Sequence, residues 1–166
     1  MRRILTLLIV LTTYLSSPAA QYLCRSVSLE DGLSQSSVTS LARDGRGFLW
    51  IGTRFGLNRY DFEKVVTYYK KPGDLNTLPE NNICTLFTDS RGRLWVAADF
   101  GVSYFDDHTN SFVRVTYNDN QLGIRSFHEE ADGLLLGGAG NIFYYDYNTG
   151  TTVPLQIKGG STFFYT

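Results

Sequence analysis

Asp44 and Asp89 are the first candidates for chemistry, because two carboxylates can act together as general acid and general base. They lie 45 residues apart in two similar segments, Asp44-Gly45-Arg46-Gly47 and Asp89-Ser90-Arg91-Gly92. Glycines that tolerate positive φ and aspartates that bond their own backbone are typical of tight hairpin turns. Equivalent turns of neighbouring repeats are held apart, so we interpret both aspartates as turn formers.

Two short clusters carry groups that can bind metals, Asp106-Asp107-His108 and Asn118-Asp119-Asn120. Neither has the ligand spacing of a calcium loop or the His and Cys set of a zinc site. We therefore expect solvated turns, with no metal and no cofactor. His108 and His128 have no serine or cysteine nucleophile motif near them, so the sequence gives little support to acyl transfer. We expect the chain not to be an enzyme.

Trp50 and Trp95 have flat aromatic faces that could stack on sugar rings. Both occupy the same position of a repeat, within the apolar segments Phe48–Gly52 and Leu94–Ala97. Such short apolar runs are typical of strands that are buried on both faces. The sequence therefore favours core packing for both indoles over a ligand platform.

The elements that position these residues come from an internal repeat. Asp44–Gly52 returns as Asp89–Ala97, and Tyr60-Asp61 returns as Phe105-Asp106 and, in a degenerate third copy, as Tyr145-Asp146. A period in the low forties, with short strands in each unit, is typical of a β-propeller blade. No such unit buries its apolar face alone, so the predicted fold is an all-β stack of blades.

We predict a β-propeller fragment of about three four-stranded blades plus the first strand of a fourth. The expected strands are 38–43, 48–52, 57–60 and 65–69, then 83–88, 94–97, 102–105 and 112–116, then 124–128, 134–137, 142–145 and 152–155, and finally 162–166. The expected division is 1–20 signal peptide, 21–36 N-terminal strand and lead-in, 37–76 blade 1, 77–120 blade 2, 121–158 blade 3, and 159–166 start of a truncated blade 4.

Propellers usually close with about four to eight blades. We therefore expect this sequence to be the N-terminal part of a longer product, or the product of a truncated gene. Residues 25–29 would then suit the outer strand that completes the last, missing blade.

One turn changes in composition while the blade around it stays constant. The turn between the second and third strands reads Thr53-Arg54-Phe55 in blade 1, Ala98-Asp99-Phe100 in blade 2 and Gly138-Ala139-Gly140 in blade 3. Variable loops on a constant scaffold are where repeat proteins carry function. Such loops gather at one end of the disc, so we predict that Arg54 and Asp99 help to line a ligand-facing rim.

The N-terminus has the order of a secretory signal, with basic Arg2-Arg3, apolar Ile4–Leu15 and small residues at Ser16–Ala20. The apolar run is shorter than a membrane span of about 20 residues, so we expect cleavage after Ala19 or Ala20, with an uncleaved anchor as the alternative. Loss of both arginines lowers the net charge from −1 to about −3. That charge gives no indication of nucleic acid or an anionic membrane surface as a partner.

Export would bring both cysteines of the chain, Cys24 and Cys84, into an oxidising compartment, where they could pair. Against this pairing, Cys84 lies inside an apolar strand, where a lone thiol behaves as a small hydrophobic residue. The sequence leaves both states open.

These motifs resemble the two-component regulator propeller repeats. The resemblance rests on Glu30–Gln35, on the run from Asp44 through Trp50 to Thr53, and on Gly56–Tyr60. It covers nearly all of the chain that follows the signal. Blade 2 departs from the pattern with two alanines where Gly-Thr is usual, and blade 3 lacks the tryptophan.

The resemblance implies the extracytoplasmic sensor of a bacterial hybrid two-component histidine kinase. In such proteins two propellers precede a β-sandwich, one membrane span, a kinase core, a receiver and often a helix-turn-helix regulator. Many respond to oligosaccharides and switch on genes for their uptake and breakdown.

From the resemblance we therefore expect a periplasmic sensor propeller without a kinase core, responsive to an oligosaccharide or another small molecule. In the full-length relative it would contact the remaining blades, reach the inner membrane only through downstream segments, and bind no nucleic acid in this region. Homodimerisation of that relative is left open.

Two other functional classes remain as alternatives. A secreted propeller enzyme that acts on polysaccharide would need convergent acids, or a His and Tyr pair, on the channel face, and these residues show no such set. A protein-interaction propeller would capture a partner tightly and be indifferent to small molecules.

Overall fold

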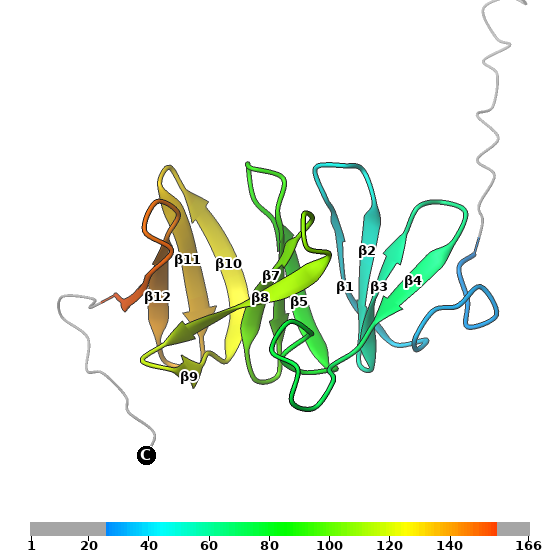
Figure 1. Ribbon diagram of the computed structural model, residues 1–166, viewed down its shortest axis with the longest axis horizontal. Helices are drawn as coiled ribbons and strands as arrows, with labels where there is room; N and C mark the ends of the chain where they lie inside the picture. The colour runs from blue at the N-terminus through cyan, green and yellow to red at the C-terminus, as the bar shows by residue number, and fades with distance from the viewer. Residues whose placement is uncertain (1–25, 156–166) are drawn as a thin grey trace, which may run out of the picture.

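The computed structural model describes residues 26–155, which form strands and turns without a helix (Figure 1). This part of the chain therefore contains no helix that could cross a membrane. Thirteen strands form three antiparallel sheets. The first sheet contains β1 (Val38–Arg43), β2 (Leu49–Thr53), β3 (Gly56–Tyr60) and β4 (Val65–Tyr68). The second contains β5 (Ile83–Thr88), β6 (Leu94–Ala98), β7 (Val102–Asp106), β8 (Ser111–Tyr117) and β9 (Asn120–Gln121). The third contains β10 (Ile124–Glu130), β11 (Gly133–Gly138), β12 (Ile142–Asp146) and β13 (Thr152–Pro154).

Each sheet is an antiparallel meander, because its strands pair in the order of the sequence. The all-β prediction is confirmed, and the predicted strands within 26–155 agree with the observed ones to one or two residues at their ends. We refer to the sheets as blades 1, 2 and 3.

Blade 2 has a fifth strand that we did not predict. The two residues of β9 pair with the end of β8, with Thr116 opposite Gln121. Asn118 and Asp119 precede β9 and have positive φ values of 47° and 62°. Asn and Asp tolerate this left-handed backbone, so the chain can reverse there and return along β8.

The lead-in to blade 1 consists of turns. Residues 26–29 form no strand, in contrast to the strand expected at 25–29. A strand needs a partner, and none of the described strands pairs with these residues. The predicted signal segment, Cys24 and the strand expected at 162–166 lie outside the described residues.

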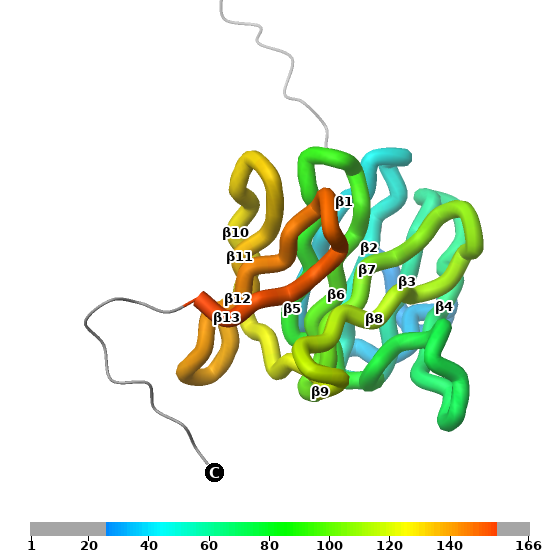
Figure 2. Tube along the Cα trace, turned by 60° about the vertical axis from the view of Figure 1, so that its left-hand side comes forward, coloured from blue at the N-terminus to red at the C-terminus, as the bar shows by residue number. Residues whose placement is uncertain are grey.

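The three blades stand side by side in chain order, with the first and last blades at opposite ends of the array (Figures 1 and 2). The first strands of the blades are neighbours, since β5 packs against β1 of blade 1 and against β10 of blade 3. On the other side, β4 is the outermost strand of blade 1, and in blade 2 the short β9 pairs beyond β8. Neighbouring inner strands are what stacking around a common axis requires.

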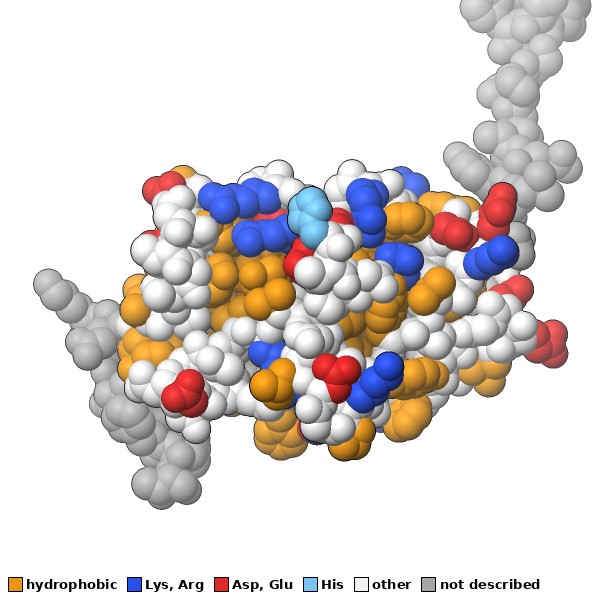
Figure 3. Space-filling model, in the orientation of Figure 1, with side chains coloured by type: hydrophobic (Ala, Val, Ile, Leu, Met, Phe, Trp, Pro, Cys, Tyr) orange, Lys and Arg blue, Asp and Glu red, His pale blue; other side chains and the backbone are white. Residues whose placement is uncertain are grey.

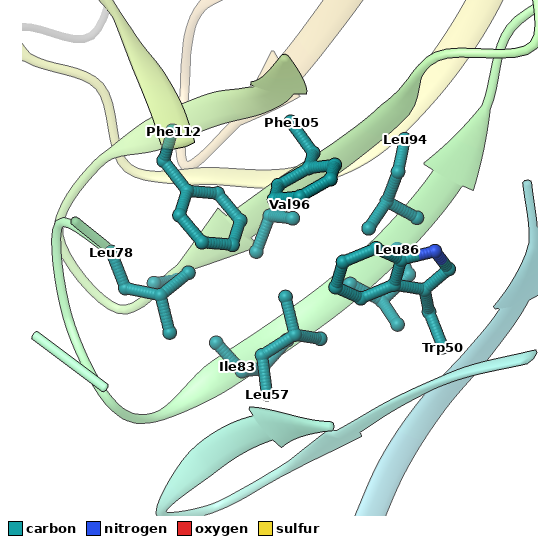
Figure 4. Packing of buried hydrophobic residues seen from close by; sticks show 10 residues of the cluster. Trp50, Leu57, Leu78, Ile83, Leu86, Leu94, Val96, Phe105 and Phe112 are labelled. Carbon is teal, nitrogen blue, oxygen red and sulfur yellow. The ribbon is translucent and has the colours of Figure 1, made fainter. Parts of the chain in front are cut away.

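The apolar core lies between blades, as the repeat predicts. Ten buried residues separate blades 1 and 2, and nine of them are labelled in Figure 4: Trp50, Leu57, Leu78, Ile83, Leu86, Leu94, Val96, Phe105 and Phe112. A second cluster separates blades 2 and 3: Trp95, Ala97, Val102, Val115, Leu122, Ile124, Leu134, Leu136, Tyr145 and Tyr147. Each blade therefore buries its apolar face only against its neighbour.

Candidate functional site

The turns between the second and third strands lie at one end of the array, the lower edge in Figure 1. We call this end the rim. It is also the end at which the chain passes from one blade to the next. In the same orientation, several hydrophobic side chains are exposed along that edge among charged ones, and a larger group of charged side chains lies along the opposite edge (Figure 3).

Arg54 is exposed in the turn between β2 and β3. Its backbone N–H donates a hydrogen bond to the carbonyl oxygen of Ser37, at 3.2 Å. Its guanidinium forms no hydrogen bond or ion pair with any residue from 26 to 155. The turn is therefore anchored through its backbone, and a complete set of guanidinium donors faces solvent.

Asp99 occupies the equivalent position in the turn between β6 and β7, but its carboxylate is engaged. Oδ2 accepts a hydrogen bond of 2.6 Å from Nδ2 of Asn82, and the Asp99 backbone N–H donates to the Asn82 carbonyl at 3.0 Å. Oδ1 lies 3.7 Å from Nη2 of Arg125 in blade 3. Asp99 thus joins the rim turn of blade 2 to the first strand of the next blade.

A β-bulge recurs in the first strand of every blade, beside the rim. The register shifts between Val38 and Ser40, between Ile83 and Thr85, and between Ile124 and Ser126, so that Thr39, Cys84 and Arg125 are the extra residues. A bulge re-aims the side chain of its unpaired residue. In blades 2 and 3 it brings Cys84 and Arg125 together beside Asp99.

The Cys84 thiol is held in its protonated form. Burial raises its pKa, the positive charge of Arg125 opposes that shift, and the hydrogen bond that the thiol donates to Asp99 Oδ1 at 3.5 Å adds to it. A thiol in this state is a poor nucleophile. Its pairing with Cys24 remains an open prediction, because Cys24 lies outside the described residues.

An exposed phenylalanine follows each charged rim residue. Phe55 is 56% exposed and Phe100 is 69% exposed. The next residue in each turn is a glycine with strongly positive φ, 116° at Gly56 and 119° at Gly101, a conformation that glycine adopts without strain. The rim therefore presents two aromatic faces next to hydrogen-bonding side chains, a combination that suits a polyhydroxylated ring.

The remaining candidates have structural roles. Oδ1 of Asp44 accepts turn N–H groups from Arg46 and Phe48, and Oδ2 accepts the indole N–H of Trp50 at 2.7 Å. In blade 2 the same oxygens of Asp89 accept turn N–H groups and the Trp95 indole, at 2.9 Å. Both indoles are fully buried, so the predictions of turn formers and core tryptophans are confirmed. The expectation that the two turns are held apart is wrong, because the Gly45 N–H donates a hydrogen bond to the Gly92 carbonyl at 3.1 Å where the neighbouring blades meet.

The two possible metal clusters form turns. Asp106 accepts hydrogen bonds from the backbone of His108 and the hydroxyl of Thr109, and Asp107 forms an ion pair with Arg46. Across residues 26–155, no three His, Cys, Asp or Glu side chains gather in a way that could hold a metal ion. His128 is exposed and lies 3.6 Å from Glu130.

Sequence reasoning predicted the rim turns but missed the contacts of Asp99 with Asn82 and Arg125. The sequence signal for these contacts is weak, because the repeat length is not constant. The bulge residues Thr39 and Cys84 of blades 1 and 2 are 45 residues apart, but Cys84 and Arg125 of blades 2 and 3 are 41 residues apart. A fixed-offset comparison does not align the three bulges.

A comparison with known families shows what two of these repeats resemble. The family described as "Two component regulator propeller" matches residues 32–55 and 77–100, the lead-in and first strands of blades 1 and 2. These two segments are therefore similar to two-component regulator propeller repeats. Blade 3 lies outside the matched segments.

A curated relative and two solved structures resemble these propeller repeats. Histidine kinase P4 of Formosa agariphila is 38% identical over 64 residues, which are 39% of this chain and 5% of the kinase. The extracellular domain of a putative hybrid two component system from B. thetaiotaomicron superposes with a TM-score of 0.63, at 21% identity over 72% of this chain and 17% of that chain. An auxiliary nutrient binding protein from Bacteroides thetaiotaomicron gives a TM-score of 0.56, at 17% identity over 76% and 32% of the two chains. At such identities the structures show a shared fold.

Proposed function

We propose that these repeats are part of the ligand-sensing propeller of a two-component sensor that faces the periplasm. The match of two repeats to the two-component regulator propeller family carries this proposal. The names of its relatives support it, since one is a histidine kinase and another is an extracellular domain of a putative hybrid two component system. The contribution of this chain would be binding, and phosphoryl transfer would belong to a kinase core elsewhere in the sensor.

The proposed ligand is an oligosaccharide bound at the rim. Phe55 and Phe100 would stack on sugar rings, and the free guanidinium of Arg54 would donate hydrogen bonds to hydroxyl or carboxylate oxygens. Asp99 would contribute an acceptor while its bond to Asn82 holds it in place. To signal, such a ligand must bind one arrangement of the sensor more tightly than the other.

Calorimetry on the intact sensor ectodomain tests this proposal, with neutral and acidic oligosaccharides as probes. Arg54→Ala and Asp99→Asn are each expected to weaken binding about tenfold, because each removes a hydrogen bond that involves a charged group. Arg46→Ala, at the opposite end of blade 1, is the matched control and should bind as the unmodified protein does.

Uniform absence of binding would count against sugar sensing. Binding that neither rim variant alters would place the ligand elsewhere. Tight capture of a partner protein through the exposed phenylalanines, without any sugar binding, would favour an interaction propeller instead.

A further inference from the structure

A groove lies between the outer strands of blades 1 and 2, beside the rim, because its lining residue Tyr69 packs against Phe55 with ring centroids 5.8 Å apart. It encloses about 280 Å³ and is lined by the end of β4, by the loop that leads to blade 2, and by the start of β8. This volume is just below the range of about 300–1,000 Å³ that is typical of small-molecule sites. The groove therefore has room for a single sugar ring.

The walls of the groove are fixed by hydrogen bonds. The Phe112 N–H donates to the Asn76 carbonyl at 2.9 Å, which ties the loop to β8. Within the loop, the Thr77 hydroxyl accepts from the Lys71 N–H at 3.0 Å and donates to the Asp74 carbonyl at 2.9 Å. A pre-formed site of this kind binds a ligand without an ordering cost.

The floor of the groove is aromatic. Phe112 is buried, and the half-buried ring of Tyr68 packs edge-on against it, with ring centroids 5.5 Å apart. The Tyr68 hydroxyl points toward Asn110, but its 3.5 Å separation from Oδ1 makes this a weak hydrogen bond. A ligand hydroxyl could replace this contact at little cost.

Several polar groups of the lining are free to bind a ligand. The hydroxyl of Thr67, the side-chain amide of Asn76 and Nδ2 of Asn110 form no hydrogen bond with the rest of residues 26–155. Lys71 is the only charged residue among the lining side chains of this groove. Donors and acceptors of neutral character therefore surround an aromatic floor.

We infer that this groove binds one neutral glycosyl unit, at a subsite that adjoins the rim turn of blade 1. Amides and hydroxyls can donate to and accept from sugar hydroxyls, and the ring of Tyr69, which is 38% exposed in the lining, can cover the apolar face of the sugar. Because amides and hydroxyls make up most of the polar lining, a ligand without charge can satisfy it. The inference rests on the proposed oligosaccharide ligand but assigns it a second contact.

The test is a double variant, Tyr68→Phe with Asn110→Gly, in the intact ectodomain. Tyr68→Phe keeps the ring packing and removes the hydroxyl. Asn110 has a φ of 51°, which glycine adopts readily, so Asn110→Gly removes the amide without straining the turn. The control, Tyr117→Phe with Asn118→Gly, makes the same changes outside the groove, and Asn118 has a φ of 47°.

Calorimetry measures the Kd of each disaccharide for the three proteins. The neutral probes are cellobiose, maltose, xylobiose and mannobiose, and the acidic probe is digalacturonic acid. We expect the groove variant to raise the Kd of at least one neutral disaccharide about tenfold, because two hydrogen bonds are lost, and the control to leave it unchanged.

Neutral binding that the groove variant does not weaken would overturn the groove site while leaving oligosaccharide sensing intact. Binding of digalacturonic acid alone, lost with Arg54→Ala, would likewise overturn the groove and support the rim. If no probe binds to the unmodified ectodomain, both the groove and the proposed function fail.

Discussion

Arginine and aromatic residues exchange places between blades 1 and 2. In blade 1, Arg59 lies 4.9 Å from the ring centroid of Phe48 and 5.7 Å from that of Trp50. In blade 2, Arg93 is the equivalent of Phe48 and Tyr104 is the equivalent of Arg59. The Arg93 guanidinium lies 5.3 Å from the ring centroid of Tyr104 and 5.5 Å from that of Trp95. Each blade therefore keeps a cation over its tryptophan while the strand that supplies it changes.

This exchange predicts coupling between positions 48 and 59. Phe48→Arg and Arg59→Tyr should each lower the free energy of unfolding by about 1 kcal/mol, because each removes the cation–π contact. The double variant reproduces the arginine and tyrosine pair of blade 2. Its loss of unfolding free energy should be about 1 kcal/mol smaller than the sum of the losses in the two single variants. Urea unfolding of the four proteins in the cycle gives the coupling energy.

As a control for that cycle, Phe48→Arg combined with the distant Tyr117→Phe should be additive. A double variant at positions 48 and 59 that is as unstable as the sum of its parts would show that the two arrangements are not equivalent.

At the scale of the element, each blade ends its third strand with the same aspartate turn. Asp61, Asp106 and Asp146 accept hydrogen bonds from groups two and three residues further along the chain. These bonds lower the pKa of all three carboxyls, through Lys64 and Glu63 at Asp61, through Thr109 and His108 at Asp106, and through Thr149 and Asn148 at Asp146.

A lowered pKa in the folded state makes stability depend on pH. The contribution of these carboxyls to the free energy of unfolding is fully present above their ordinary pKa of 3.8. It is lost as the pH falls through their lower pKa values in the folded state. Asn accepts the same turn hydrogen bonds but does not titrate. We therefore expect Asp61→Asn/Asp106→Asn/Asp146→Asn to flatten the fall in urea-unfolding free energy below pH 4 or so.

The control for this pH profile removes three exposed carboxylates that do not close these turns, with Glu63→Gln/Asp119→Asn/Glu130→Gln. It should retain the acid-induced fall. Equal flattening by both triple variants would assign the effect to net charge and not to the turns.

At the scale of the whole molecule, one residue joins blades 2 and 3 at the end opposite the rim. The Glu129 carboxylate of β10 accepts hydrogen bonds from the backbone and hydroxyl of Ser90, at 2.8–3.0 Å, and from the Tyr147 hydroxyl at 3.1 Å. Burial, the nearby Asp89 charge and the bond to Glu129 all raise the pKa of Tyr147, so its hydroxyl remains a donor.

Loss of this junction should loosen blade 3 alone, because repeat units depend on their nearest neighbours. Glu129→Ala should lower the unfolding free energy by about 1 kcal/mol, since the site is partly exposed and water can replace some bonds. Hydrogen exchange should rise in β10–β12 and stay unchanged in β1–β4.

The adjacent Glu130→Ala is the matched control for Glu129→Ala, because within residues 26–155 the Glu130 carboxylate has a single ion-pair partner, the exposed His128 at 3.6 Å. Exchange that rises equally in blade 1, or an equal loss of stability in the control, would argue against the nearest-neighbour interpretation.

The first blade also presents an apolar surface at the end of the described array. Leu41 is 58% exposed and Val38 is 48% exposed on β1, and Leu29 is 58% exposed in the lead-in. In blade 2 the corresponding face packs against blade 1 and its residues Ile83 and Leu86 are buried. The outermost face of the described array is therefore apolar at blade 1.

Much of the fold could be predicted from the sequence, because the features that define a blade are local. The hairpin at Asp44 and its copy at Asp89 depend on a few consecutive turn residues, and buried strands such as Leu94–Ala98 are contiguous apolar runs. The repeat then placed Trp50 and Trp95 in equivalent interfaces. Local patterns of this kind are readable without knowing which segments meet in space.

The tertiary structure alone decided which distant side chains meet. Arg125 reaches Asp99 and Cys84 because a bulge re-aims it across a blade boundary, and the groove exists because the loop after β4 folds back beside Asn110. These contacts depend on how neighbouring sheets are stacked and on how far each sheet is shifted relative to the next. The sequence of one repeat specifies its own hairpins directly, but it specifies this shift only through contacts with the neighbouring repeat. The sequence by itself therefore determined the blades, while their packing determined the contacts of the rim and the groove between them.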